Sequence, residues 1–248
     1  MVLGYICYMK QLVCLLLVLS MGSVFAQRSE NSPFSTKRND SIKVVDNAYR
    51  EDQFYISVTY NLLGNKPENV SQNGFSSGFH FGFIRDMPLN KKRNVAIGIG
   101  MGLSSNSYNQ TVLVSETNTG YDYSVLGDVT FSKNKFTTYL VECPIEFRWR
   151  TSTAKDFDFW RIYSGIKLGY VLYNTSKFRG SPNDISLSNI SDLNKFQYGL
   201  SLSAGYSNVN FYFYYALNTI FDSSAIVTGS QEQVEMNTIK IGLIFYIL

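Results

Sequence analysis

The chain has 248 residues and a formal net charge of +3, and it is 15% aromatic but only 17% charged. So much Tyr and Phe with so little charge excludes intrinsic disorder for most of the chain, and so small a net charge argues against a nucleic-acid-binding surface. With 1 His and 3 Cys, the chain cannot supply the four ligands of a zinc site, so no metal or other cofactor is expected.

The N-terminus, residues 1–26, is predicted to be a secretory signal peptide. Lys10 precedes a short apolar run, 12–19, and small residues lead to a cleavage site between Ala26 and Gln27, which together are typical of an export signal. The alternative, a membrane anchor, needs about 20 consecutive apolar residues.

Residues 27–50 are rich in Ser, Asn and charge and show no periodicity. This composition predicts a flexible periplasmic segment; ordering by a partner is the alternative. The rest of the chain, residues 51–248, is predicted to form one β-domain.

Within residues 51–248, apolar residues alternate with small or polar ones, which places one set on each face of a strand. The opposite face carries mostly Gly and Ser with a few charges, too few polar groups for a solvated surface. The segments approach or exceed the ~9–11 residues with which a tilted strand crosses a bilayer, against ~5–6 in soluble proteins. They are 54–62, 75–83, 95–103, 139–150, 160–172, 197–206, 209–218 and 239–247.

The connections between these segments alternate in length. Long ones are 64–74, 105–135, 176–192 and 222–231, and short ones are 86–93, 151–158 and 207–208. Outer-membrane barrels place short turns in the periplasm and long loops outside. The sequence therefore predicts an eight-stranded antiparallel transmembrane β-barrel of the outer-membrane type, with both termini in the periplasm; a soluble barrel is the alternative.

Aromatic residues gather at the predicted strand ends, as in the interfacial girdles of membrane barrels. One girdle is expected at Phe147, Trp149, Phe159 and Trp160, and the other at Tyr139, Tyr170, Tyr173 and Phe178.

Several ionisable residues fall on the predicted inward face. Eight strands enclose a space that side chains just fill, and charges in such an interior are costly unless opposite signs pair. A polar network that fills the lumen is expected, with a proton path or a ligand site as the alternative. Its predicted members are Glu142, Glu146, Arg148, Arg161, Lys167, Lys240 and His80.

Catalysis and a small-molecule substrate are not expected. Ser76 and Ser77 stand near His80 in the sequence, but no acid can be assigned to the neighbourhood of this His, and a nucleophilic site needs one. Cys143 is expected to face lipid, and Pro144 predicts a bulge in its strand, because proline removes a ladder donor.

Three stretches resemble the PorT family of Bacteroidota outer-membrane barrels. They are GFHFGFIRDMPLNKKRNVAIGIGMG at 78–102, PIEFRWRTST at 144–153 and FWRIYSG at 159–165. The resemblance runs over residues 52–248. It implies a non-catalytic role in type IX secretion, the route that exports adhesins, proteases and gliding proteins across the outer membrane.

The two short turns in these stretches are expected to face the periplasm, where their charges are candidates for docking other type IX secretion components. Anchoring of the barrel at the membrane surface is the alternative. The second functional hypothesis is a stand-alone surface barrel for adhesion or envelope integrity that uses loop 105–135, and the third is a lipid-modifying enzyme. The candidate docking residues are Arg85, Asp86, Lys91, Lys92, Arg93, Arg150 and Lys155.

Overall fold

A computed structural model of the chain describes residues 52–247 except 119, 128–130, 152–158 and 182. The predicted signal peptide with its cleavage site, the segment 27–50 and Lys155 therefore lie outside the described residues. Across the described part, all regular structure is strand, and no helix is long and apolar enough to cross a membrane.

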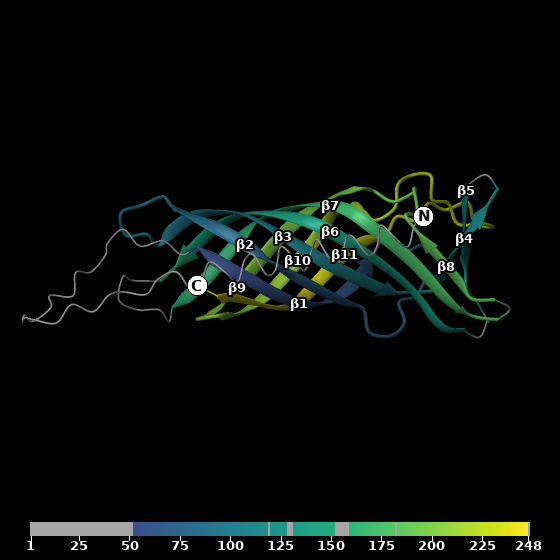
Figure 1. Cartoon of the computed structure of the whole chain (residues 1–248), viewed down its shortest axis with the longest axis horizontal. Helices are drawn as coiled ribbons and strands as arrows, with labels where there is room; N and C mark the ends of the chain where they lie inside the picture. Colours follow the sequence, from purple (N-terminus) through teal and green to yellow (C-terminus); the bar gives the residue numbers. More distant parts are fainter. Residues whose placement is uncertain (1–51, 119, 128–130, 152–158, 182, 248) are drawn as a thin grey trace, which may run out of the picture. The chain divides into compact units, whose positions relative to one another are not determined.

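Eight strands form a closed antiparallel barrel, as the sequence predicted (Figure 1). Each strand pairs with the next barrel strand along the chain, and the last pairs with the first, so the sheet has no free edge within the barrel. In chain order they are β1 (Gln53–Gly64), β2 (Ser77–Pro88), β3 (Val95–Asn109), β6 (Phe131–Arg150), β7 (Trp160–Gly180), β9 (Phe196–Tyr206), β10 (Val209–Thr219) and β11 (Asn237–Ile247).

The predicted apolar rows face outward. Met101 is 69% exposed and Phe211 is 76% exposed, whereas their neighbours on the opposite parity face the interior. Burying a large apolar side chain stabilises a protein by about 1.5–3 kcal/mol relative to leaving it in water. A whole wall of such side chains therefore requires hydrocarbon around it.

Glycines on the inward face let tyrosine rings lie against the sheet. Gly82 on β2 pairs directly with Gly102 on β3. A Cβ atom on Gly102 would stand 2.2 Å from the Tyr55 hydroxyl oxygen and 2.6 Å from the Phe81 carbonyl oxygen. The absence of a side chain at both glycines thus provides the space that the Tyr55 ring fills.

Pro144 does not produce the predicted bulge. The β3–β6 ladder passes from Ile99↔Ile145 to Gly102↔Glu142 without a change of register and omits the two pairs between them. Proline removes one donor from the ladder, and here the gap needs no inserted residue. The register shift nearest to Pro144 lies between β6 and β7, at Tyr139/Leu140.

The strands extend further than predicted at the end that carries the long loops, here called the loop end. Loop 105–135 contains the ends of β3 and β6 and a hairpin of β4 (Val112–Thr117) and β5 (Gly120–Val125). Loop 176–192 contains the end of β7 and β8 (Ile185–Ser188), which pairs with it. The prediction failed because the apolar alternation ends there while the backbone ladder continues.

A hydrophobic cluster, the loop-end cap, packs at this end. The Phe221 ring lies 5.5 Å from the Tyr123 ring and 5.3 Å from the Phe136 ring. Backbone N–H of Thr228 donates to the Tyr123 carbonyl at 2.7 Å, which ties the hairpin to the β10–β11 loop. Burial and the Asp192 carboxylate raise the pKa of Tyr123, so its hydroxyl stays protonated and donates to Asp192. Buried members of the cap are Leu63, Val70, Tyr108, Val112, Val114, Tyr123, Phe136, Leu140, Val171, Ile190, Leu193, Ile220, Phe221, Ala225, Val227, Val234 and Met236.

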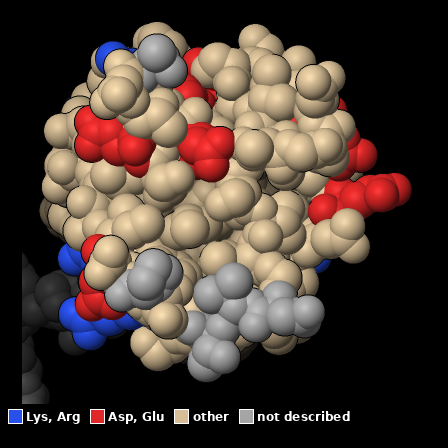
Figure 2. All heavy atoms as spheres, turned by 90° about the vertical axis from the view of Figure 1, so that its right-hand side faces the viewer, with Lys and Arg blue, Asp and Glu red and all other residues tan. Residues whose placement is uncertain are grey.

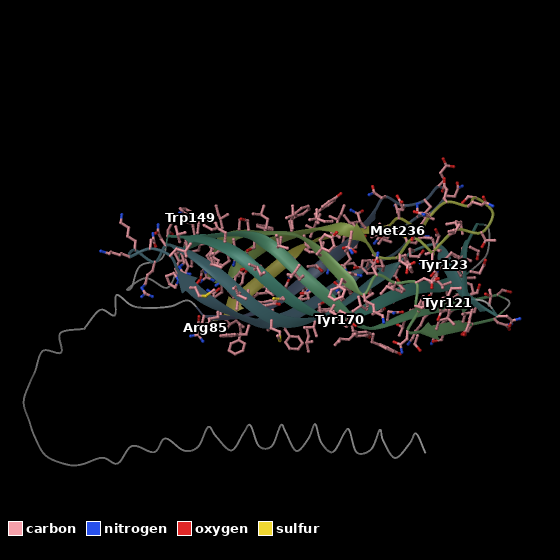
Figure 3. All side chains as sticks on the ribbon, turned by 90° about the horizontal axis from the view of Figure 1, so that it is seen from above. Arg85, Tyr121, Tyr123, Trp149, Tyr170 and Met236 are labelled. Carbon is pink, nitrogen blue, oxygen red and sulfur yellow. The ribbon has the colours of Figure 1, made fainter. Side chains whose placement is uncertain are left out.

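Exposed aromatic residues gather in two girdles on the outer wall, and Figure 3 labels one residue of each, Trp149 and Tyr170. Towards the opposite end, here called the turn end, the Trp160 and Tyr206 rings lie 5.4 Å apart; towards the loop end, Tyr139 lies 5.9 Å from Tyr173. Trp149 belongs to the first girdle and Tyr170 to the second.

Two residues predicted for the girdles lie elsewhere. Phe159 and Phe178 are buried, at 2% and 4% exposure. The prediction was wrong because both have the inward parity of their surroundings: Phe159 precedes the outward Trp160, and Phe178 follows a register shift in the β6–β7 ladder.

The glycine pair under Tyr55 gives a test of the packing. We expect Gly102→Leu to force the Tyr55 ring away and to destabilise the barrel by more than the ~1–3 kcal/mol typical of overpacking, because backbone is also in the way. The folded fraction is measured by heat-modifiable migration in gels. Met101→Leu on the exposed face is the matched control, and equal folded fractions for the two variants would contradict the packing described.

Candidate functional site

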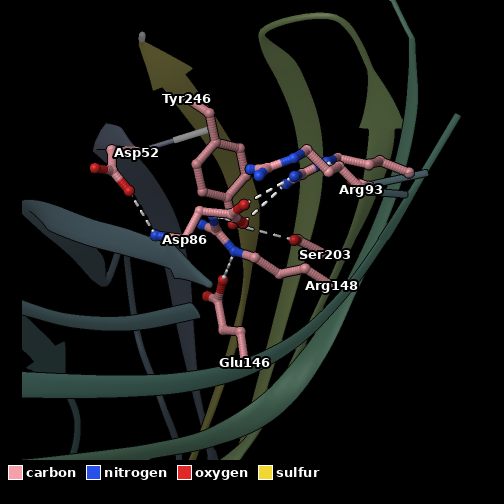
Figure 4. Close-up of polar contacts among 8 residues, drawn as sticks. Asp52, Asp86, Arg93, Glu146, Arg148, Ser203 and Tyr246 are labelled. Carbon is pink, nitrogen blue, oxygen red and sulfur yellow. Dashed lines mark hydrogen bonds and ion pairs between the residues drawn. The ribbon is translucent and has the colours of Figure 1, made fainter. Parts of the chain in front are cut away.

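The barrel interior contains two ionic clusters. The turn-end cluster consists of Asp86, Glu146, Arg148, Arg150 and Arg161 (Figure 4 shows most of it). The Asp86 carboxylate accepts hydrogen bonds from Nη1 and Nη2 of Arg150, both at 2.8 Å, and from Nη1 of Arg148 at 3.2 Å. Arg148 Nε donates to Glu146 Oε2 at 3.1 Å. Such bidentate, charge-assisted pairs are among the stronger hydrogen bonds in proteins.

Asp86 and Arg150 are not docking residues, contrary to the sequence-based hypothesis. Both are buried, at 1% and 0% exposure. Asp86 lies near the end of β2 and points inward, with its backbone N–H donating to Asp52 Oδ1 at 2.7 Å. Their place at strand ends made them look like turn residues, but their parity directs them into the lumen, where they pair with each other.

Aromatic rings cover the cations of the turn-end cluster. The Arg148 guanidinium lies 4.5 Å from the centroid of the Tyr163 ring, and that of Arg161 lies 4.4 Å from the Phe159 ring. The Tyr246 ring lies 5.4 Å from Tyr163 and within 6 Å of both arginines. Cation–π contacts of this kind stabilise a desolvated guanidinium.

The second, mid-barrel cluster centres on Glu142. Its carboxylate lies 3.1 Å from His80 Nδ1, 3.4 Å from Lys167 Nζ and 3.9 Å from Lys240 Nζ. The two ammonium groups also face tyrosine rings, Lys167 at 4.7 Å from Tyr212 and Lys240 at 4.9 Å from Tyr214. One carboxylate on β6 thereby joins side chains of β2, β7 and β11.

The structure brings the seven predicted network residues into the interior, where they form two clusters. Some of their partners were not predicted from the sequence. Missed members are Asp86, Arg150 and the tyrosines that cover the cations. Strand parity could have identified each of these residues as inward-facing. Asp86 shares the parity of His80 on β2, and Tyr212 and Tyr214 stand in the inward row of β10.

A hydroxyl, an imidazole and a carboxylate do lie in a row at Thr59, His80 and Glu142. Thr59 Oγ1 is 3.5 Å from His80 Nε2. On the other side of the ring, the Glu142 carboxylate is 3.1 Å from His80 Nδ1, so an acid does stand beside His80, contrary to expectation. This order is that of a catalytic triad. However, the Thr59 hydroxyl donates to Asn61 Oδ1 at 2.8 Å, and all three side chains are buried, at 2% exposure or less. The arrangement therefore belongs to the filled lumen.

The serines near His80 in the sequence have other contacts. Ser76 Oγ accepts a hydrogen bond from the Asn109 backbone N–H at 2.9 Å, and Ser77 Oγ lies 3.4 Å from Ser107 Oγ. Among the described residues, no group of three or more His, Cys, Asp or Glu side chains is placed to hold a metal ion.

The turn between β2 and β3 is well braced. Leu89 N–H donates to the Val95 carbonyl at 2.8 Å, and Arg93 N–H donates to Asn90 at 3.0 Å. From inside the barrel, Arg150 Nε donates to the Arg93 carbonyl at 3.0 Å. The buried ion pair of Arg150 with Asp86 therefore also fixes one side of this turn.

Of the docking candidates, four remain on the surface near this turn. Lys91 and Lys92 are exposed at its tip, and Arg93 is half-buried beside them. Arg85 is exposed on the outer wall of β2 (Figure 3). The structure thus separates the candidates into a basic surface group and a buried ionic pair.

Comparison with known families agrees with the geometry. A family model described as an outer membrane protein beta-barrel domain matches residues 25–222. No curated protein matches the chain.

The mid-barrel cluster gives a second test. We expect Glu142→Gln to destabilise the folded barrel by about 3–5 kcal/mol, because it leaves two buried ammonium groups without their shared carboxylate. The free energy of unfolding is measured by urea titration in lipid vesicles.

Two further variants complete this measurement. Glu116→Gln, at an exposed residue near the end of β4, is the matched control and is expected to change stability by less than about 0.5 kcal/mol. Adding Lys167→Met to Glu142→Gln should restore part of the loss, since it removes one uncompensated charge. Equal stability of Glu142→Gln and the control would show that Glu142 does not balance these charges.

Proposed function

The chain belongs to the family of outer membrane protein β-barrel domains, and from this premise we propose that it is a non-enzymatic component required for type IX protein secretion. It acts in the outer membrane, with both barrel termini and the short turns in the periplasm. The resemblance of residues 78–102 and 144–153 to the PorT family supports this role. Residues 78–102 extend over β2, the β2–β3 turn and β3, and residues 144–150 lie on β6.

The filled interior supports action through the surface. Two ionic clusters with their tyrosines occupy the lumen, and the loop-end cap packs at one end. A barrel of this size has little free internal space, so its contribution to export is that of an assembly or accessory factor. Its contacts are made by turns and the outer wall.

The braced basic turn is the observation that carries the proposal. Lys91 and Lys92 project from a turn whose backbone is held by Asn90, Val95 and the buried Arg150. A pre-ordered turn loses little conformational entropy on binding. Two adjacent lysines favour an acidic surface on a periplasmic component of the secretion machinery, and complementary charge accelerates and orients such docking.

Charge reversal at this turn tests the docking. We expect Lys91→Glu with Lys92→Glu to reduce crosslinking from a probe placed at the exposed Leu89 to a periplasmic component by about tenfold or more, since like charges at a docking surface cost several kcal/mol. Secretion of type IX cargo should fall in parallel, and both are measured in the same cells.

The matched control reverses lysines at the loop end, Lys66→Glu with Lys195→Glu, both exposed. This variant should keep crosslinking and cargo secretion at the level of the unmodified chain. Normal secretion by the Lys91→Glu, Lys92→Glu variant would contradict docking through this turn.

The second candidate function is a stand-alone barrel for adhesion or envelope integrity. The folded loop end favours it, because the hairpin β4–β5 is hydrogen-bonded to the β10–β11 loop. Figure 2 shows this end with several acidic patches. Deletion of the gene separates the two functions: lost cargo secretion with an intact envelope supports the first, and lost adhesion with normal secretion supports the second.

Replacement of the Thr59 hydroxyl tests the absence of catalysis. Thr59→Val keeps the shape of the side chain and removes the hydroxyl that lies 3.5 Å from His80 Nε2. We expect cargo secretion to be unchanged within about twofold, because the proposed role needs no nucleophile. A loss of secretion in a barrel that folds normally, by heat-modifiable migration, would favour an enzyme instead.

A further inference from the structure

A basic groove crosses the outer wall of the barrel just beyond the loop-end girdle. It has a volume of about 210 Å³ and extends over β2, β3, β6 and β7. Three lysines line it, Lys133 and Lys135 on β6 and Lys177 on β7. No part of the lumen contributes to it, since these positions have the outward parity of Tyr139.

The cations of this wall stand directly opposite one another. Lys135 pairs with Lys177 across the β6–β7 ladder, and Lys133 pairs with Arg179. Like charges directly opposite on neighbouring strands are destabilising. Among the described residues, none of these four side chains takes part in an ion pair. Two successive repulsive pairs thus call for an external anion.

The floor of the groove is built from small hydroxyl residues. Ser105 and Ser107 on β3 and Thr137 on β6 lie beneath the lysines, and Ser107 and Thr137 are nearly buried. Small side chains hollow the wall. The Ser107 hydroxyl donates to the Ser77 carbonyl at 3.2 Å, while the hydroxyl groups of Ser105 and Thr137 add donors for anionic oxygens. Phe79 and Tyr139 line the side towards the membrane. The groove thus joins a cationic, hydroxyl-rich part to an aromatic part.

Its height matches the headgroups of a lipid leaflet. The Tyr139–Tyr173 ring pair marks the interface, as aromatic girdles do. Lys135 is four residues beyond Tyr139 on the same strand, which is ~13 Å along the strand and ~10 Å in height at the usual tilt. A long lysine side chain that bends back towards the ring pair brings its ammonium group to the level of lipid phosphates, and the apolar wall below is at the level of acyl chains.

We propose that this groove binds the phosphorylated headgroup of an outer-leaflet glycolipid of the lipid A type, with Lys135 and Lys177 contacting phosphate and the wall below Tyr139 contacting acyl chains. This assignment rests on the proposed orientation, with the loop end outside the cell. The neighbouring loop tips carry mostly acids, which confines the attraction for phosphate to the groove. The exposed or half-exposed acids of the loops are Glu68, Glu116, Asp122, Asp184, Asp192, Asp222, Glu232 and Glu235.

The experiment measures lipid retention by native mass spectrometry. The full barrel is extracted in detergent and incubated with phosphorylated lipid A or with the same lipid after removal of its phosphate. We expect phosphorylated lipid A to be retained and Lys135→Gln with Lys177→Gln to weaken this retention about 25-fold, near fivefold for each lysine. Lys66→Gln with Lys195→Gln is the matched control and should retain lipid as the unmodified chain does.

Thermal stability provides a second readout, because the lysine substitutions should affect the unfolding temperature differently without and with lipid A. In detergent without lipid A, Lys135→Gln with Lys177→Gln should unfold at the same or a higher temperature, since it removes a repulsive pair. With phosphorylated lipid A added, the unmodified chain and the control should gain stability, and Lys135→Gln with Lys177→Gln should not. Lys135→Arg with Lys177→Arg keeps the charges and should keep the gain.

Three results would overturn the proposal. They are undiminished lipid retention by the Lys135→Gln, Lys177→Gln variant, equal retention of dephosphorylated lipid, and full competition by millimolar inorganic phosphate, which would identify a free-phosphate site. The measurement is made on purified protein, so a failure of the secretion role leaves it unaffected.

Discussion

The structure depends on carboxylates that are each shared by several cations across the lumen. Glu142 on β6 is within 4 Å of side chains from β2, β7 and β11, and Asp86 on β2 accepts from two arginines of β6. Ions removed from water are tolerated only where opposite charges and further hydrogen bonds replace the lost solvation. These contacts therefore connect strands that share no backbone ladder, such as β2 and β6. The barrel is thus held together across its interior as well as around its wall.

The tyrosines complete this core. Tyr163, Tyr212 and Tyr214 each place a ring against a buried cation. A ring contributes apolar volume and a negative π-face at once, so these residues fill the cylinder and solvate its charges. Glycines on the facing strands provide the space, as Gly82 and Gly102 do for Tyr55. An interior filled in this way leaves the turns, the loops and the outer wall as the places where the protein contacts other molecules.

Much of this could be predicted from the sequence, because a strand imposes a period of two residues. The period fixed which residues face lipid, which face the lumen and how many strands close the barrel, and it placed Glu146 beside Arg148. It could not say where a strand stops. Asp86 and Arg150 looked like turn residues, although they continue the inward rows of β2 and β6. Beyond Tyr139, Lys135 and Thr137 replace the apolar row, and the strand looked like a loop. The ion pairs that stabilise the interior, such as Glu142 with Lys240, join strands that are distant in the sequence, so no local sequence pattern predicts them.

The same argument explains why the net charge of +3 says little about this protein. Strand parity and height in the membrane sort the charges into separate populations. Inward Arg148, Arg150, Lys167 and Lys240 pair with internal carboxylates. Outward Lys135 and Lys177 stand opposite each other on neighbouring strands and take part in no ion pair among the described residues. The loop tips are acidic and the β2–β3 turn is basic. Fields from populations separated by more than a Debye length, about 8 Å at physiological ionic strength, are largely independent. Each end and the outer wall therefore present their own electrostatic character to a ligand, and the sum over the chain describes none of them.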